Sequence, residues 1–163
     1  MKFNLIDRIE AAGPDRIVAF KYVSLAEEYL ADHFPTFPVL PGVMMLEALT
    51  QAAGWILHLR NDFARSMAVL KEARNVKYGQ FVAPGNWLKV EVELSKTTET
   101  GAVFKASGLV GTSQALSARI ELAYFDLAQK NPELAGIDQR LKEHNRRRWG
   151  LIAPSTSGVV AVG

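Results

Sequence analysis

The sequence contains no cysteine and only three histidines. Without cysteine the chain can form neither a disulfide bond nor a thiolate nucleophile, and the cysteine-containing zinc sites are excluded. The histidines, at positions 33, 58 and 144, are too scattered for a metal-binding motif such as H-E-x-x-H. The P-loop and the G-x-S-x-G nucleophile elbow are also missing. We therefore expect no metal site, no nucleotide and no other cofactor.

Long apolar runs and a strong excess of one charge are missing as well. No stretch of about 18 residues is apolar and free of charge, so no membrane span is expected. The start, MKFNLIDRIE, reaches Asp7 too early for a secretory signal, which favours a cytoplasmic protein. The net charge is only +2, and the positive excess lies in residues 126–163. This distribution argues against nucleic-acid binding, which needs a broad basic surface.

What is present is the pattern of one α+β domain. The chain has 163 residues, 48% of them hydrophobic, which is enough to bury a core. Two strands, a long helix and four more strands are predicted at residues 3–11, 15–24, 43–60, 66–78, 87–98, 102–111 and 114–125. This order favours an antiparallel sheet wrapped around a central helix within residues 1–125. A short helix at 25–31 is expected from the capping-box pair Ser24 and Glu27.

Residues 126–163 are predicted to be an extension of this domain. Residues 137–149 have the pattern of a basic helix, and residues 155–163 (STSGVVAVG) that of a flexible end. The helix could form a patch that attracts an acidic partner. The alternative is a solvated helix packed on the domain, and the sequence favours this second interpretation.

The long helix carries one polar stripe on an otherwise apolar surface. Its non-apolar positions are Glu47, Thr50, Gln51, Gly54 and His58, whose spacings of three, four, seven and eleven residues place them on one face. A buried carboxylate is costly unless something pairs with it, so Glu47 indicates that this face meets water, a partner or a cavity. His58, near the end of the helix, is interpreted as a favourable charge at the helix C-terminus.

A proline-rich loop leads into this helix. Pro35, Pro38 and Pro41 restrict the backbone, so the loop should be stiff and should present the first N–H groups of the helix in a fixed direction. Gly42 allows a ligand to approach its N–H closely. His33 stands at the start of the loop. A base, a carboxyl group and an oriented N–H are the parts needed for proton chemistry beside a carbonyl.

The segment HFPTFPVLPGVMMLEALTQ, residues 33–51, resembles the H-F-P-x-x-P-x-x-P-G-V-x-x-x-E-A-x-x-Q signature of FabZ-type 3-hydroxyacyl-(acyl-carrier-protein) dehydratases. The similarity extends from NLIDRIEAAGPDRIVAFKYVS before it to VKYGQFVAPGNWLKVEVEL after it, and ends near Phe125. These proteins have the hotdog fold, which agrees with the predicted order of helix and strands. The resemblance implies fatty acid biosynthesis, with acyl carrier protein as the partner that delivers the substrate.

The resemblance also implies roles for individual residues. His33 would remove the proton α to the thioester, Glu47 would assist the departing hydroxyl, and the Gly42 N–H would bind the thioester oxygen. Two further roles follow from the spacing on the helix and not from the resemblance. Gln51, one turn after Glu47, would help to hold it or a water molecule, and Gly54 would either leave room for the acyl chain or only allow the helix to pack closely on the sheet. In the family the histidine and the glutamate come from different subunits, so a homodimer with shared active sites is expected.

Two other functions remain open at this point. A hotdog thioesterase would use a carboxylate or polar residue of the helix to direct water, although the spacing from His33 to Glu47 argues against it. A non-catalytic module that binds acyl thioesters is the other alternative. It is kept open by Asp32 and Thr36, which stand where the family usually has glycine.

Overall fold

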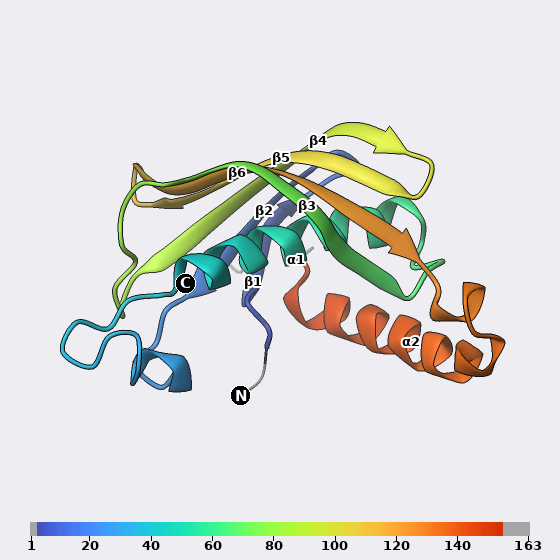
Figure 1. The fold of residues 1–163 in the computed structure, drawn as a ribbon, viewed down its shortest axis with the longest axis horizontal. Helices are drawn as coiled ribbons and strands as arrows, with labels where there is room; N and C mark the ends of the chain where they lie inside the picture. The colour runs from blue at the N-terminus through green and yellow to red at the C-terminus, as the bar shows by residue number, and fades with distance from the viewer. Residues whose placement is uncertain (1–2, 155–163) are drawn as a thin grey trace, which may run out of the picture.

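The computed structural model describes residues 3–154, which form one curved sheet, a central helix and a second helix (Figure 1). The strands are β1 (Arg8–Ala12), β2 (Arg16–Tyr22), β3 (Met67–Tyr78), β4 (Trp87–Thr98), β5 (Gly101–Val110) and β6 (Ser113–Phe125). The helices are α1 (Gly42–Arg60), α2 (Ala135–Ile152) and the short 3-10 turns η1 (Glu28–Leu30), η2 (Leu127–Gln129) and η3 (Pro132–Leu134). The strand order is β1-β2-β4-β5-β6-β3, and every neighbouring pair is antiparallel.

The sheet wraps around α1, as the sequence predicts. Figure 1 shows the strands arching over the helix, which lies along their concave face. In β4 the residues alternate, and Leu88, Val90 and Val92 are buried toward the helix. Ala52 and Ala53 of α1 are fully buried, and their small side chains let the helix lie close to the sheet. The sheet around a central helix, predicted from the order of the elements, is therefore confirmed, as is the hotdog fold that the resemblance implies.

The chain before α1 differs from the prediction in two places. Residues 3–7 are not a strand, because the Leu5 N–H donates to the Gln51 side chain (2.9 Å) instead of to a neighbouring strand. The predicted helix at 25–31 is wrong, since only the single turn η1 forms. Ser24 Oγ accepts from the Ala26 N–H, two residues on, and the Glu27 carboxylate pairs with buried Lys21 instead of completing a capping box.

The two edges of the sheet are very unequal. β1 has 5 residues, whereas β3 has 12 and, within residues 3–154, pairs with β6 alone. Two register irregularities interrupt the β3–β6 ladder, and Asn75 in the second has a positive φ of 53°. A long edge strand with an unpaired row of backbone N–H and C=O groups is a template for another chain.

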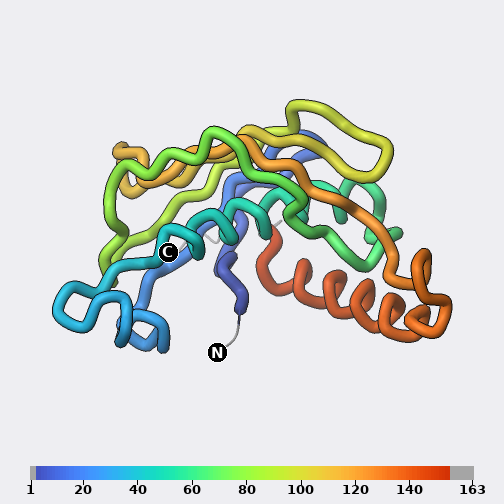
Figure 2. Tube along the Cα trace, in the orientation of Figure 1, coloured from blue at the N-terminus to red at the C-terminus, as the bar shows by residue number. Residues whose placement is uncertain are grey.

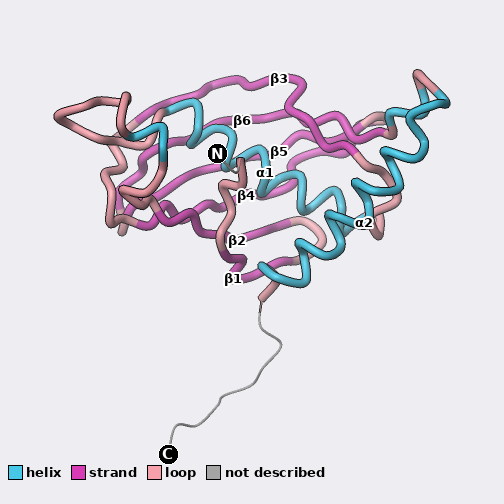
Figure 3. The backbone as a smooth tube through the Cα atoms, turned by 90° about the horizontal axis from the view of Figure 1, so that it is seen from below, coloured by secondary structure: helices cyan, strands magenta, loops and turns pink. Residues whose placement is uncertain are grey.

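The second helix packs against the C-terminal half of α1, on the side away from the sheet (Figure 3). Its first turn is fixed by Asp138, which is buried and accepts hydrogen bonds from Ser66 Oγ and from the N–H groups of Leu127 and Ala128. Burial alone would raise the pKa of Asp138, but these hydrogen bonds outweigh it and hold the pKa below its usual value. The prediction of a helix within 126–163 is thus correct, and the predicted flexible end lies outside the described residues.

Candidate active site

The loop before α1 holds His33 in one orientation. Figure 2 traces the loop as an excursion beyond the end of the sheet, and its His33–Phe34 peptide is cis. The Nδ1 atom of His33 lies 3.0 Å from the Val39 carbonyl oxygen. A carbonyl oxygen can only accept, so Nδ1 carries a proton, and in the neutral imidazole the lone pair is therefore on Nε2. This tautomer is the one that a general base requires.

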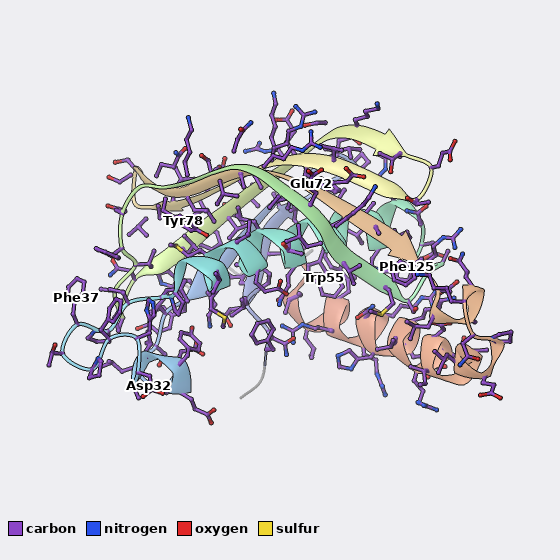
Figure 4. All side chains as sticks on the ribbon, viewed as in Figure 1. Asp32, Phe37, Trp55, Glu72, Tyr78 and Phe125 are labelled. Atoms are coloured by element: carbon purple, nitrogen blue, oxygen red, sulfur yellow. The ribbon has the colours of Figure 1, made fainter. Side chains whose placement is uncertain are left out.

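Gly42 lies in the same cleft as His33. The cleft has a volume of about 260 Å³ and is lined by His33, Leu40, Gly42, Met45, Tyr78, Gly79, Gln80 and Phe81. As the first residue of α1, Gly42 has an N–H without an intrahelical acceptor, at the positive end of the helix dipole. A Cβ atom at this position would come within 2.8 Å of the Tyr78 ring, so a larger residue would require this ring to move. Tyr78 is labelled near the start of α1 in Figure 4.

Glu47 is held by Gln51, as the spacing of one helical turn suggests. Gln51 Nε2 donates to Glu47 Oε1 at 2.9 Å and to the Phe3 carbonyl at 3.1 Å. Gln51 Oε1 accepts from the Leu5 N–H. One amide side chain therefore connects the carboxylate to the segment before β1 and restricts how Glu47 can turn.

The polar stripe of α1 faces a second cleft. This cleft has a volume of about 180 Å³ and contains all five stripe residues, Glu47, Thr50, Gln51, Gly54 and His58. Its walls are completed by Trp55 of α1, Ala68 of β3, the segment before β1 and three residues of α2. Those α2 residues, His144, Asn145 and Arg148, were not predicted, because the sequence has no local pattern that reports contacts between distant helices.

Within one chain, His33 and Glu47 line different clefts. The first cleft contains an imidazole and the N–H of a helix N-terminus, and the second contains a hydrogen-bonded carboxyl group. Neither cleft alone contains both a base that could take a proton from one carbon and an acid that could give a proton to a hydroxyl on the neighbouring carbon.

Within residues 3–154 no group of three or more His, Asp or Glu side chains could hold a metal ion, and no helix is long and apolar enough to cross a membrane.

His58 does not act as a charged group at the end of α1, so that interpretation is wrong. Its side chain is buried, and burial lowers the pKa of His58 to about 4, so the imidazole is neutral at pH 7. Its Nδ1 lies 3.4 Å from the Tyr124 hydroxyl and its Nε2 lies 3.4 Å from Asn145 Nδ2. His58 thus connects α1 to β6 and α2.

The neutral state of His58 predicts a specific loss of stability in acid. The unfolded chain takes up a proton on this group below pH 6.5, whereas the folded chain resists until about pH 4. Stability should therefore fall as pH drops through this window, by up to about 3 kcal/mol. Urea unfolding across this range should show a shallower decline for His58→Gln than for wild type. The control His144→Gln, at an exposed histidine of α2, should follow wild type, and equal slopes for all three proteins would contradict the assignment.

The profile of the FabA-like domain family matches residues 1–119. Curated relatives named 3-hydroxyacyl-(acyl-carrier-protein) dehydratase FabZ match over most of their length. The protein from Solibacter usitatus is 36% identical over 121 residues, covering 74% of each chain. Those from Pelotomaculum thermopropionicum and Clostridium kluyveri are 37% and 32% identical, covering 75% and 79% of this chain and 86% and 88% of theirs.

Solved structures agree on the fold. A chain of the dehydratase heterocomplex ApeI:P from Xenorhabdus doucetiae superimposes with a TM-score of 0.67 at 16% identity, covering 82% of this chain and 90% of that one. A mutant thioesterase from Pseudomonas aeruginosa gives a TM-score of 0.59 at 17% identity, covering 74% of this chain and 81% of its own. Because both activities occur on this backbone, the fold alone does not choose between them.

Proposed function

The chain belongs to the FabZ-type 3-hydroxyacyl-(acyl-carrier-protein) dehydratases of the FabA-like family, and from this we propose that it converts a 3-hydroxyacyl thioester to the 2-enoyl thioester in fatty acid biosynthesis. The substrate is carried by acyl carrier protein, the carrier in the names of its relatives. We propose a cytoplasmic location, the one expected of an enzyme of fatty acid biosynthesis related to these proteins.

The residues of the two clefts supply each step of this elimination. The thioester oxygen accepts a hydrogen bond from the Gly42 N–H, which stabilises the negative charge that develops there. His33 Nε2 removes the proton from the α-carbon, and the electron pair forms the new double bond. The C–O bond at the β-carbon breaks, and Glu47 gives a proton to the hydroxyl so that it leaves as water. His33 then returns a proton to Glu47 through solvent.

A homodimer brings these groups together. His33 and Glu47 line separate clefts of one chain, so the base of one subunit has to meet the carboxyl group of another. The long unpaired edge of β3 supports such an assembly, because two copies can pair there into one continuous sheet. The start of α1 is near the end of β3, and Val43 on its first turn is 70% exposed in the single chain.

The observation that carries the proposal is that His33, with its Nδ1 bonded to the Val39 carbonyl, lines the same cleft as Gly42, the first residue of α1. A single assay tests it: purified protein is incubated with a 3-hydroxyacyl thioester, and the enoyl product and free thiol are both followed. Enoyl formation without thiol is expected. Thiol release would indicate a thioesterase, and neither product would indicate a binding module.

Gly54 is proposed to make room for the acyl chain beside Glu47. A Cβ atom there would meet only the Ala68 Cβ, at 3.4 Å, so the larger side chain of Gly54→Leu must project into the cleft. We expect the longest substrates that the enzyme accepts to lose about tenfold or more in kcat/KM, and the shortest to keep most of their rate. Gly54→Ala is the matched control. A uniform loss at all lengths together with a lowered melting temperature would mean that Gly54 serves only packing.

A further inference from the structure

The cleft that contains Glu47 is closed on one side by α2. Three side chains of this helix, His144, Asn145 and Arg148, line it opposite the stripe of α1. The family match ends at residue 119, so this wall comes from a part of the chain that the match does not include. The wall is therefore a feature in which this chain can differ from other members of the family.

Contacts on several sides fix the wall in place. The rings of Trp149 and Trp55 are 5.7 Å apart between centroids, and Figure 4 shows Trp55 pointing from α1 toward α2. Arg148 donates to the Ile6 carbonyl at 3.1 Å, and Asn145 lies within 3.5 Å of both His58 Nε2 and the Ser66 carbonyl. Because these partners belong to α1, to the segment before β1 and to the loop before β3, α2 cannot move away without breaking contacts to all three.

Polar groups of α2 line two sides of the cleft. At the end away from Glu47, Asn145 lies 3.4 Å from the Nε2 of His58, which is eleven residues after Glu47 on α1. Arg148 lines the side next to the segment before β1, where it donates to the Ile6 carbonyl. An alkyl chain that reached them would take polar groups out of water without replacing their hydrogen bonds, which is unfavourable.

Resting on the proposed function, we infer that α2 sets the acyl-chain length and restricts this enzyme to short 3-hydroxyacyl thioesters. The carbons next to the thioester lie between the catalytic groups, and the alkyl end stops at Asn145 and Arg148. A longer chain has no apolar path past this wall. The specificity of the enzyme thus resides in a helix that contributes nothing to the chemistry.

The test measures kcat/KM for short (about four-carbon) and long (about twelve-carbon) 3-hydroxyacyl thioesters, with the ratio of long to short as the readout. Wild type should favour the short substrate by at least about tenfold. Asn145→Ala should raise the ratio about tenfold by opening the wall. Arg148→Met keeps the aliphatic stem and removes the charge, and it should raise the ratio in the same way.

Arg147→Ala is the matched control, because Arg147 is exposed on the same helix and does not line the cleft. It should keep the wild-type ratio. The inference is overturned if wild type dehydrates long and short substrates equally, or if neither wall variant changes the ratio while both retain a wild-type melting temperature. A wild-type protein that dehydrates none of the series would instead remove the proposed function itself, so the two failures are distinct.

Discussion

Replacing Glu47 by glutamine should lower kcat by about 10²- to 10⁴-fold while leaving the fold intact. The amide keeps the size of the side chain, and its carbonyl oxygen can still accept from Gln51 Nε2, as Glu47 Oε1 does at 2.9 Å. What disappears is the proton that the departing hydroxyl needs. Steady-state rates with a 3-hydroxyacyl thioester, measured beside thermal unfolding, test this.

Two observations keep the Glu47 result interpretable. The melting temperature should not fall, because an ionisable group has been removed from a half-buried position. Glu10→Gln, at an exposed carboxylate on β1, is the control and should retain the wild-type rate. A Glu47→Gln enzyme as active as this control would eliminate Glu47 as the acid.

Two inactive variants should restore activity when they are mixed. In a dimer formed from one His33→Ala chain and one Glu47→Gln chain, one site receives both defects and the other receives none. Random exchange makes half of the dimers mixed, so about a quarter of wild-type activity should return. Rates are measured after the two proteins have been incubated together long enough for exchange.

Subunit exchange has to be demonstrated separately in this experiment. Mass spectrometry of chains with and without isotope labels would show the mixed dimer directly. Mixing two samples of His33→Ala is the control and should restore nothing. If mixed dimers form and no activity returns, His33 and Glu47 do not share a site across the interface.

Local patterns were sufficient to predict the order of the elements. The helix predicted at 43–60 is observed as Gly42–Arg60, and the strand predicted at 87–98 has those bounds. Alternation in a strand and a stripe on a helix arise from burial of one face, so they can be read without knowing the partner. The stripe from Glu47 to His58 indeed faces a cleft.

Features that depend on distant contacts could not be predicted. His58 looks like a helix-terminal charge until Tyr124, Asn145 and α2 bury it. Residues 3–7 have the composition of a strand, but a hydrogen bond from Leu5 to Gln51 replaces the strand pairing. In both cases the deciding partner lies more than forty residues away, as the separations of 46 for Leu5 and Gln51 and 66 for His58 and Tyr124 show. Sequence periodicity carries no information at that range.

The hydrogen bond from the Leu5 N–H to Gln51 makes one backbone amide a reporter of how the Glu47 carboxyl group is held. Its proton can exchange with solvent only when Gln51 releases it, and Gln51 is also the group that holds Glu47. Slow hydrogen exchange at Leu5 therefore marks chains in which Glu47 is held ready, and fast exchange marks chains in which it is free to turn. The NMR signal of the Leu5 amide thus measures, without substrate, the fraction of chains in which Gln51 is in place to hold Glu47.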